Sequence, residues 1–351
     1  MTASLAAVDL FCGAGGLTQG LVREGIPVLA GIDLDPAARY PFEFNNGASF
    51  VEMDIEDLGG REVRDFYPPG VIRIMVGCAP CTPFSPFTQG RDAKGCPEWG
   101  LLDSFARITE IVRPGVLSME NVVQLRRHAV FRQFVRRLVR LGYHVTDYDV
   151  SCPDYGVPQR RIRLVLFGSL FGPVEMLPPT HAASRFVTVR DAIANLPSLA
   201  AGEAHPTDPL HRSSGLTKIN LRRIRASRQG GTWRDWHSEL MLSCHLHDSG
   251  SSYTPVYGRM SWNEPSPTIT TQFYNYGSGR FGHPEQDRAI SLREAAILQS
   301  FPQDYAFLAP GEETSLRAVG RLIGNAVPVR LGRVIARSML IHLEEFGALR
   351  R

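Results

Sequence analysis

The first half of the chain alternates between short apolar runs and longer segments in which apolar residues recur every three or four positions. Short runs rich in Val, Ile and Leu are typical of buried strands, and the three-to-four spacing is typical of amphipathic helices. This alternation predicts an α/β fold with a mostly parallel sheet. The predicted strands are residues 5–11, 28–32, 50–55, 72–78, 116–122, 144–151 and 162–167, and the predicted helices are residues 17–24, 36–44, 102–112 and 130–141.

The last two predicted strands break the alternation of strand and helix. The segment between them contains Pro153, Gly156 and Pro158, which disfavour a helix. Strands joined without a crossover helix are expected to run antiparallel. We therefore expect an antiparallel edge strand on an otherwise parallel sheet.

The pattern changes after about Pro178. From there to about Asp287 the chain is rich in Gly, Ser, Pro, Thr and His, and its periodicity is weak. Helical spacing returns at 291–299, which begins with a capping box of Ser291 and Glu294, and in a long segment near the C-terminus. Because a long terminal helix needs a large core to pack on, we expect the chain to return to its first domain. The predicted division is residues 1–177, a smaller irregular domain at 178–287, and the return at 288–351.

Length, composition and charge exclude several classes of protein. The chain has 351 residues, of which 43% are hydrophobic and 21% charged, as in an ordinary globular protein with room for a main domain and an insert. Because no apolar run reaches the length of a membrane span and the N-terminus lacks a signal-peptide pattern, we expect a cytoplasmic protein without membrane contact. Six cysteines do not indicate a disulfide framework in a chain of this length.

Positive charge is carried almost entirely by arginine, because lysine occurs only at Lys94 and Lys218. The net charge is only +3, but residues 211–234 are basic and contain no acidic residue. Basic residues interleaved with aromatic ones favour contact with nucleic acid, and a merely polar surface is the alternative. The residues predicted to bind nucleic acid are Arg212, Arg222, Arg223, Arg225 and Arg228.

A glycine-rich loop follows the first predicted strand. Gly13 and Gly15 favour a tight turn, after which the backbone amides at the start of a helix can cradle a nucleotide-type cofactor. Asp33 ends the next strand, about 20 residues on, where a carboxylate that holds ribose hydroxyls is expected. Thr18 stands where a dinucleotide fingerprint would have its third glycine, so a plain strand-to-helix turn stays open as the alternative.

The strand predicted at 72–78 ends just before Pro80 and Cys81, which places a thiol at the rim of the sheet. Ligands of open α/β sheets bind beyond the strand ends, and a thiol there is a nucleophile when its pKa is lowered. The next strand ends in Glu120, which we expect close to Cys81. Cys78 and Cys81 would also suit a redox pair or half of a zinc site, but no second pair with matching spacing exists, so no metal is expected.

Six segments spread over nearly the whole chain stand out as motifs: DLFCGAGGLTQG (Asp9–Gly20), GCAPCTPFS (Gly77–Ser85), MENV (Met119–Val122), YGVPQRRIR (Tyr155–Arg163), REAAILQSFP (Arg293–Pro302) and GNAVP (Gly324–Pro328). In this order they resemble the motifs of the C5-cytosine-specific DNA methyltransferase family. The resemblance implies a Rossmann-like catalytic and cofactor-binding domain at 1–177 and 288–351 and a target-recognition domain at 178–287. The chain departs from the pattern at Thr82, where many members have glutamine, and at Leu34, where an aromatic residue often follows the ribose acid.

The resemblance also implies a reaction and roles for single residues. The family transfers a methyl group from S-adenosylmethionine, leaving S-adenosylhomocysteine, to C5 of a cytosine that is rotated out of the duplex. Cys81 would add to C6 of the base, Glu120 would hold N3 and the 4-amino group, and Arg163 would contact O2, with Arg161 and Gln159 ordering the pocket. The implied cofactor residues are Phe11, Gly13, Ala14, Gly15, Gly16, Asp33, Leu34, Asp54, Ile55, Pro80, Asn325 and Val327, and Ser85 is an implied substrate contact.

The implied partner is double-stranded DNA, bound by a monomer, with a cognate restriction endonuclease that acts separately. A C5-cytosine RNA methyltransferase on the same scaffold stays open, although the large basic insert favours duplex DNA. A catalytically silent DNA-binding relative is disfavoured because Cys81, Glu120 and Arg163 are all present. A nicotinamide oxidoreductase is disfavoured by Thr18 in the glycine loop.

Overall fold

The structure is a computed structural model that describes residues 4–80, 100–247 and 256–349. Contacts divide the chain into two compact units, each with its own hydrophobic core. Unit 1 comprises Met1–Tyr155, Ile162–Thr180 and Val327–Arg351, and unit 2 comprises Gly156–Arg161 and His181–Ala326. Within the described ranges, no helix combines the length and the apolar character that crossing a membrane requires.

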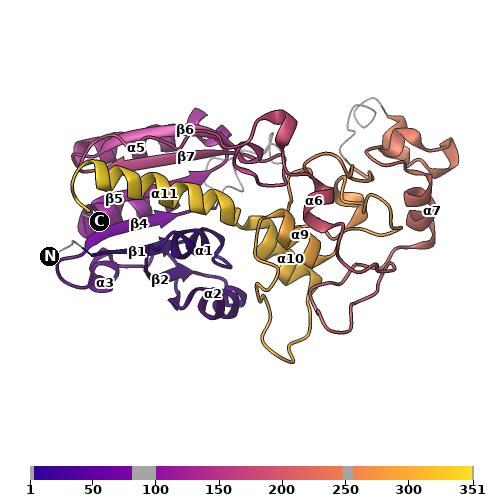
Figure 1. The fold of residues 1–351 in the computed structure, drawn as a ribbon, viewed down its shortest axis with the longest axis horizontal. Helices are drawn as coiled ribbons and strands as arrows, with labels where there is room; N and C mark the ends of the chain where they lie inside the picture. The colour runs from indigo at the N-terminus through magenta and orange to yellow at the C-terminus, as the bar shows by residue number, and fades with distance from the viewer. Residues whose placement is uncertain (1–3, 81–99, 248–255, 350–351) are drawn as a thin grey trace. The chain divides into compact units, whose positions relative to one another are not determined.

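Unit 1 is built on a seven-stranded sheet with the order β3-β2-β1-β4-β5-β7-β6 (Figure 1). The strands are β1 (Leu5–Leu10), β2 (Val28–Asp33), β3 (Ser49–Glu52), β4 (Ile72–Gly77), β5 (Val116–Asn121), β6 (His144–Ser151) and β7 (Ile162–Ser169). All pairs from β3 to β5 are parallel, whereas β7 runs antiparallel to both β5 and β6. The predicted mostly parallel α/β sheet is confirmed, and the antiparallel strand is β7, one place inside the edge that β6 forms.

Helices cover the sheet of unit 1. They are α1 (Gly16–Arg23), α2 (Arg39–Asn46), α3 (Gly60–Asp65), α4 (Gly100–Val112), α5 (Ala129–Arg140) and α11 (Val329–Glu345). The terminal helix α11 packs against α1, as the sequence predicted, and the two helices approach closely because Gly20 meets Gly332. A methyl group at Gly20 would lie 2.4 Å from the carbonyl carbon of Gly332. The short helix α3 was not predicted.

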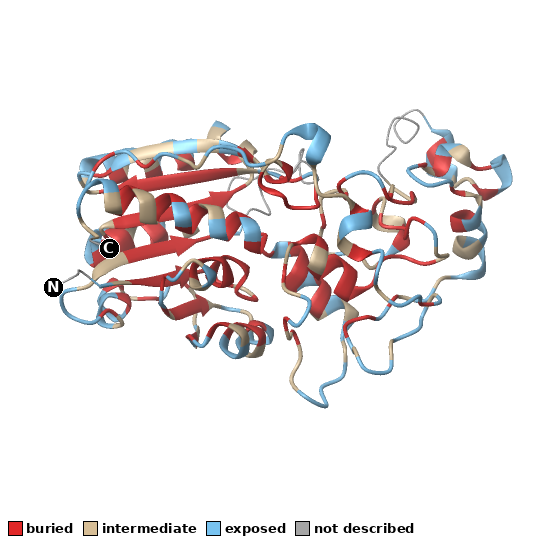
Figure 2. Cartoon of the chain, viewed as in Figure 1, coloured by how far each residue is buried: buried red, intermediate tan, exposed pale blue. Residues whose placement is uncertain are grey.

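Figure 2 shows that the central strands of unit 1 are largely buried and that the covering helices alternate between buried and exposed positions, while the edge strand β6 is partly exposed. The core joins Leu10 of β1, Met75 of β4 and Leu117 of β5 to the inner faces of α4 and α5. Phe105 of α4 and Phe134 of α5 meet edge to face, with ring centroids 5.5 Å apart. Strands that are buried along their whole length read as continuous apolar runs, which is why the sequence located them well.

Unit 2 is mostly irregular, as its composition predicted. Its helices are α6 (Val189–Ile193), α7 (Lys218–Ala226), α9 (Leu292–Leu298) and α10 (Leu316–Asn325). Helices α9 and α10 pack on each other, and α9 packs on α6, so residues 288–326 group with unit 2 and not with unit 1, where the sequence had placed them. Only residues 327–351 return to unit 1. The roles of the units as catalytic and target-recognition domains stay predictions.

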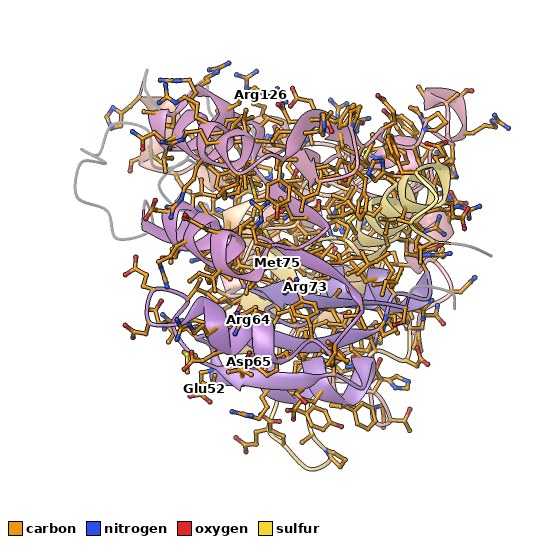
Figure 3. The ribbon with its side chains drawn as sticks, turned by 90° about the vertical axis from the view of Figure 1, so that its left-hand side faces the viewer. Glu52, Arg64, Asp65, Arg73, Met75 and Arg126 are labelled. Carbon is orange, nitrogen blue, oxygen red and sulfur yellow. The ribbon has the colours of Figure 1, made fainter. Side chains whose placement is uncertain are left out.

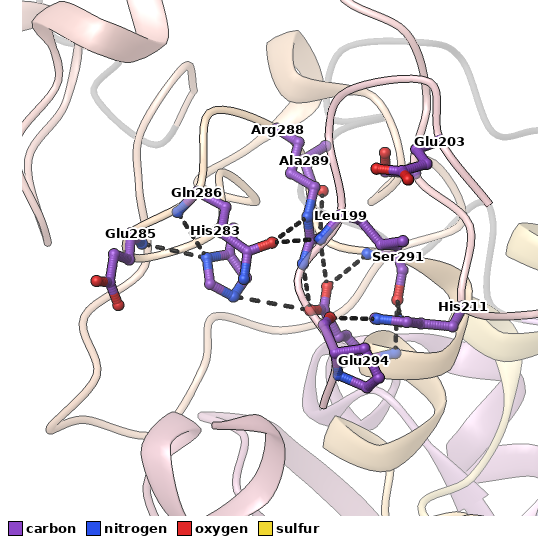
Figure 4. Close-up of polar contacts among 12 residues, drawn as sticks. Leu199, Glu203, His211, His283, Glu285, Gln286, Arg288, Ala289, Ser291 and Glu294 are labelled. Carbon is purple, nitrogen blue, oxygen red and sulfur yellow. Dashed lines mark hydrogen bonds and ion pairs between the residues drawn. The ribbon is translucent and has the colours of Figure 1, made fainter. Parts of the chain in front are cut away.

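A buried ionic cluster organises the polar part of unit 2 (Figure 4). Both Nη atoms of Arg288 donate to the carboxylate of Glu294 at 2.7 Å, and both side chains are almost fully buried. The same carboxylate accepts the backbone N–H of Ser291, which caps α9. Burial alone would raise the pKa of Glu294, but Arg288 above all holds it at about 2. The capping box predicted at Ser291 and Glu294 is confirmed, with a buried cation added to it.

Candidate active site

The site of interest lies at the carboxyl ends of β4 and β5. The two strands are parallel neighbours, with Gly77 opposite Met119, so the residues that follow them lie side by side. Pro80, which is exposed, is the last described residue before a gap in the description. Cys81, Thr82 and Ser85, on which sequence predictions rest, lie outside the described residues.

Glu120, the last residue but one of β5, is 2% exposed. The thiol of Cys78 donates a hydrogen bond to its Oε2 at 2.8 Å. Its Oε1 lies 3.0 Å from Nε of Arg163, a half-buried side chain of β7. That N–H does not point at Oε1, which has no hydrogen-bond partner of good geometry among the described residues. The carboxylate therefore has one anchored oxygen and one buried oxygen beside a cation.

Asn121 fixes the backbone just before Pro80, the last described residue of this segment. Its Nδ2 donates to the carbonyl of Ala79 at 3.0 Å, and its Oδ1 accepts the N–H of Val122 at 2.8 Å. Gly77 supports the same geometry, since a Cβ there would lie 2.6 Å from the carbonyl oxygen of Leu10. The sequence named Asn121 only as the end of a strand, and the structure adds its contact with the adjacent chain segment.

The turn after β5 is tied to the neighbouring edge of the sheet. Arg126, labelled in Figure 3, forms ion pairs with Asp147 and Asp149 of β6. The distance to Asp149 is 2.8 Å. These half-exposed pairs are weak singly, but together they restrict the segment that follows Glu120.

Arg161 and Gln159 differ from Arg163 in their surroundings. The strand β7 begins at Ile162, and Arg161 precedes it in unit 2, where its Nη atoms donate to the carbonyls of Ile269 and Ala326 at 3.3 and 3.4 Å. Arg161 therefore lies outside the strand that carries Arg163. Gln159 is fully buried and bonds to the main chain of unit 2 and to Gln299. Both side chains hold backbone in unit 2, which agrees with an ordering role, while a catalytic role for Arg161 stays a prediction.

The glycine loop has the strained geometry that its composition predicted. Gly13 and Gly15 have φ of 48° and 85°, in the left-handed region that favours glycine, and Phe11 also has a positive φ of 60°. The N–H of Gly13 donates to Oδ2 of Asp33 at 2.8 Å, and Asp35 donates to Oδ1 at 2.9 Å. Burial raises the pKa of Asp33 against these hydrogen bonds. The loop and the strand-end acid thus form one unit, with Ala14 and Gly16 buried within it.

Thr18 explains the missing third glycine. Its hydroxyl donates to Oδ2 of Asp9 at 2.6 Å, and both side chains are buried. Burial raises the pKa of Asp9 to about 7, although the bond from Thr18 opposes the shift. Gly20, two residues after Thr18, allows a different close approach, that of α1 to the terminal helix α11. The sequence does contain a signal for this buried pair, because Asp9 is an acidic residue inside an apolar strand, but it was not among the predicted site residues.

The turn after β3 is held by a residue that the sequence did not single out. Oδ1 of Asp54 accepts the N–H of Glu56 at 2.9 Å, and Ile55 is buried. Arg107 of α4 donates to the carbonyls of Ile55, Glu56 and Leu58 at 3.2, 3.0 and 2.9 Å. One guanidinium therefore fixes the backbone of the turn predicted to hold the adenine edge. The only signal for this role in the sequence was that Arg107 lies near the apolar side of the helix predicted at 102–112.

The remaining predicted cofactor residues are dispersed. Leu34 is 64% exposed beside Asp33. Asn325 is exposed at the end of α10 in unit 2, and Val327 is buried at the start of the return to unit 1. Their roles toward a cofactor stay predictions.

Most of the arginines predicted to bind nucleic acid have partners within unit 2. Arg222 pairs with Glu239 at 2.9 Å, Arg225 with Asp287 at 2.9 Å, and Arg228 with Asp235 at 3.1 Å. Arg223 is buried, bonds to the carbonyl of Leu240, and stacks over Trp236 and Tyr257 at 5.4 and 5.5 Å. The expectation that Arg223 faces nucleic acid does not fit this burial. Arg212 is exposed and has no acidic partner among the residues that the structure describes.

Comparison with known proteins identifies the class. Residues 5–340 match the model of the family described as C-5 cytosine-specific DNA methylase. The chain therefore belongs to this family, and it is a DNA (cytosine-5)-methyltransferase.

The chain is similar over its whole length to Type II modification enzymes. It is 51% identical to the Type II methylase M.HgiDII of Herpetosiphon aurantiacus over 342 residues, which cover 97% of this chain and 96% of that relative. It is 29% identical to the Type II methyltransferase M1.HphI of Haemophilus parahaemolyticus, over 96% of this chain and 87% of the relative.

A solved structure shares the fold. It is a candidate DNA modification methyltransferase encoded within an Escherichia coli prophage, with a TM-score of 0.71 and 22% identity over 97% of this chain and 100% of that chain. Within the described part of this chain, no cluster of three or more His, Cys, Asp and Glu side chains is placed to hold a metal ion.

Proposed function

We propose that this chain methylates C5 of cytosine in a specific sequence of double-stranded DNA, with S-adenosylmethionine as donor, through a covalent bond between Cys81 and C6 of the base. The main support for this proposal is the burial and hydrogen bonding of the Glu120 carboxyl group. A buried carboxyl with one anchored oxygen, one oxygen without a well-aligned donor, and a guanidinium beside it is suited to receive a polar heterocycle edge. It lies at the end of the strand next to the one that leads to Cys81.

The chemistry assigns a step to each of these groups. C5 of cytosine is too weak a nucleophile to attack a methylsulfonium directly, so the Cys81 thiolate first adds to C6 and makes C5 enamine-like. Glu120, protonated, donates to N3 as negative charge builds up there, and Arg163 stabilises charge at O2. C5 would then take the donated methyl group, whose bond to the sulfonium sulfur breaks so that S-adenosylhomocysteine leaves. Loss of the C5 proton to solvent base and departure of the thiolate from C6 would restore the ring.

S-adenosylmethionine supplies an electrophilic methyl group when bound, and unit 1 fits such a cofactor. Gly13 has no heavy atom within 4 Å of where a Cβ would lie, so the loop leaves open space beside its backbone. The carboxylate oxygens of Asp33, which accept only backbone N–H groups, keep lone pairs for ribose hydroxyls. The turn at Asp54 and Ile55, fixed by Arg107, would hold the adenine edge.

The DNA would be bound by a monomer, with the target cytosine rotated out of the stack, since C6 must be reached from the ring face. The Type II relatives support a role in a restriction-modification system, with the endonuclease as a separate protein. We propose Arg212 as a phosphate contact, because it is exposed and forms no ion pair with an acidic residue in the described part of unit 2.

Bisulfite sequencing of plasmid DNA from a host that expresses the chain tests the proposal. We expect one short sequence context to become resistant to conversion, and Cys81→Ser to abolish this while DNA and cofactor binding persist. If RNA is methylated and plasmid DNA is not, the proposed DNA substrate is wrong. Full activity of Cys81→Ser would overturn the covalent mechanism.

A further inference from the structure

The thiol of Cys78 contacts the carboxylate that the proposed chemistry uses. Cys78 follows the last residue of β4, and the parallel register that pairs Gly77 with Met119 sets Cys78 opposite Glu120. Its Sγ lies 2.8 Å from Oε2 of Glu120, a short distance for a hydrogen bond to sulfur. A thiolate at this distance would place two anions together, so the geometry fits a thiol that donates its S–H.

This contact treats the two oxygens of Glu120 differently. Oε2 is anchored by the Cys78 thiol, while Oε1 is buried beside Arg163 and has no well-aligned donor among the described residues. A hydrogen bond to a carboxylate fixes its rotation about the last side-chain bond, and it stabilises the ionised form more than the protonated one. The thiol therefore acts on both the direction and the proton affinity of the group.

We propose that Cys78 is a positioning residue for Glu120: its S–H holds Oε2, so that Oε1 is the oxygen presented to the base. This inference rests on the proposed function, in which Glu120 donates a proton toward N3. It assigns no covalent step to Cys78, and it separates the roles of the two cysteines of the Cys-x-x-Cys segment.

A pH profile of the methyl-transfer rate constant under saturating substrates tests the role. The proposed chemistry needs a proton on Glu120, so the rate should fall towards high pH. Cys78→Ala removes a hydrogen bond that favours the ionised carboxylate, and it should move this falling limb to higher pH by roughly half a unit to one unit, the size expected for one net hydrogen bond. Cys78→Ser retains a donor and should bring the limb back toward the wild-type position.

Cys152→Ala, which removes the buried thiol of a different cysteine of unit 1, is the matched control and should leave the limb in place. A merely structural role of Cys78 would lower activity or stability in both Cys78 variants without moving the limb. An unmoved limb in Cys78→Ala, or one that moves to lower pH, overturns the inference.

The S–H stretching band in the infrared gives a readout that needs no activity. In the full chain carrying Cys81→Ser, the difference spectrum against the Cys78→Ala double variant should contain a band shifted to low frequency by a strong acceptor. Adding Glu120→Ala should return that band to the position of a weakly bonded thiol. If Glu120→Ala leaves the band unchanged, the Cys78 thiol does not bond to Glu120 and the inference is wrong. The proposed function is tested separately, by bisulfite sequencing.

Discussion

His283 offers a quantitative test of the buried polar cluster in unit 2. The imidazole is 2% exposed, and its Nδ1 accepts the backbone N–H groups of Glu285 and Gln286 at 3.1 and 2.9 Å (Figure 4). A proton on Nδ1 would break both bonds, so the neutral tautomer with hydrogen on Nε2, 3.7 Å from Glu294, is the one that fits. Burial lowers the pKa of His283 to about 4, and the nearby Arg288 acts in the same direction while Glu294 opposes it.

The size of the effect follows from the difference between the folded and unfolded states. An unfolded chain protonates this histidine at its ordinary pKa of 6.5, whereas the folded chain does so only at about 4. Stability is therefore full above pH 6.5 and is lost as pH falls toward 4, because the unfolded state binds the proton first. At about 1.4 kcal/mol per pH unit, the loss reaches about 2 kcal/mol by about pH 5 and about 3 kcal/mol below pH 4.

Urea unfolding of wild type and His283→Asn at several pH values between 7.5 and 5 measures this loss. Trp233, Trp236 and Trp262 all lie in unit 2, so tryptophan fluorescence reports on it. The Asn variant keeps an acceptor near Nδ1, should be less stable at neutral pH, and should lose about 2 kcal/mol less than wild type on going to about pH 5. Replacement of the exposed His237 by Asn is the control. Equal pH slopes for wild type and His283→Asn would refute the reasoning.

Further predictions concern the cofactor turn, helix packing and DNA. Arg107→Ala frees three carbonyls and should raise the KM for S-adenosylmethionine about tenfold, with the KM for DNA nearly unchanged, as steady-state kinetics can show. Gly20→Ala should lower the free energy of unfolding by about 1–3 kcal/mol through overpacking, whereas Gly215→Ala, which has nothing near the added methyl, should not. Arg212→Ala should weaken DNA binding and reduce its salt dependence by about one counterion in a titration, more than Arg222→Ala, whose guanidinium already has an acidic partner.

The sheet of unit 1 could be predicted from the sequence because most of its strands are short apolar runs buried on both faces, although the edge strands β3 and β6 are partly exposed. The glycine loop and the strand-end acids Asp33 and Glu120 were visible for a related reason, since polar residues directly after such runs mark the rim of the sheet. The elements of unit 2 were harder to predict. The helix α7 carries four basic residues in nine and gave no clear apolar stripe. The helix α10 was not predicted, although Val319, Leu322 and Ile323 form a buried stripe on it.

The basic segment at 211–234 shows most clearly what the sequence could not predict. Arginines at 222, 223 and 225 looked alike in the sequence, but Arg223 points into an aromatic core while its neighbours pair with acids distant in the chain. Net charge and composition describe a segment's potential for DNA contact, and they do not tell which guanidiniums are already engaged.

The sequence by itself determined the order of the strands and of most helices in unit 1, the family, and the residue types of the site, because burial and turn chemistry act locally along the chain. The tertiary structure alone decided which side chains meet. The bond from Cys78 to Glu120, and the hold of Arg107 on the turn after β3, join residues more than 40 positions apart. Strand register and helix packing create such pairs, and neither leaves a periodic signal in the sequence.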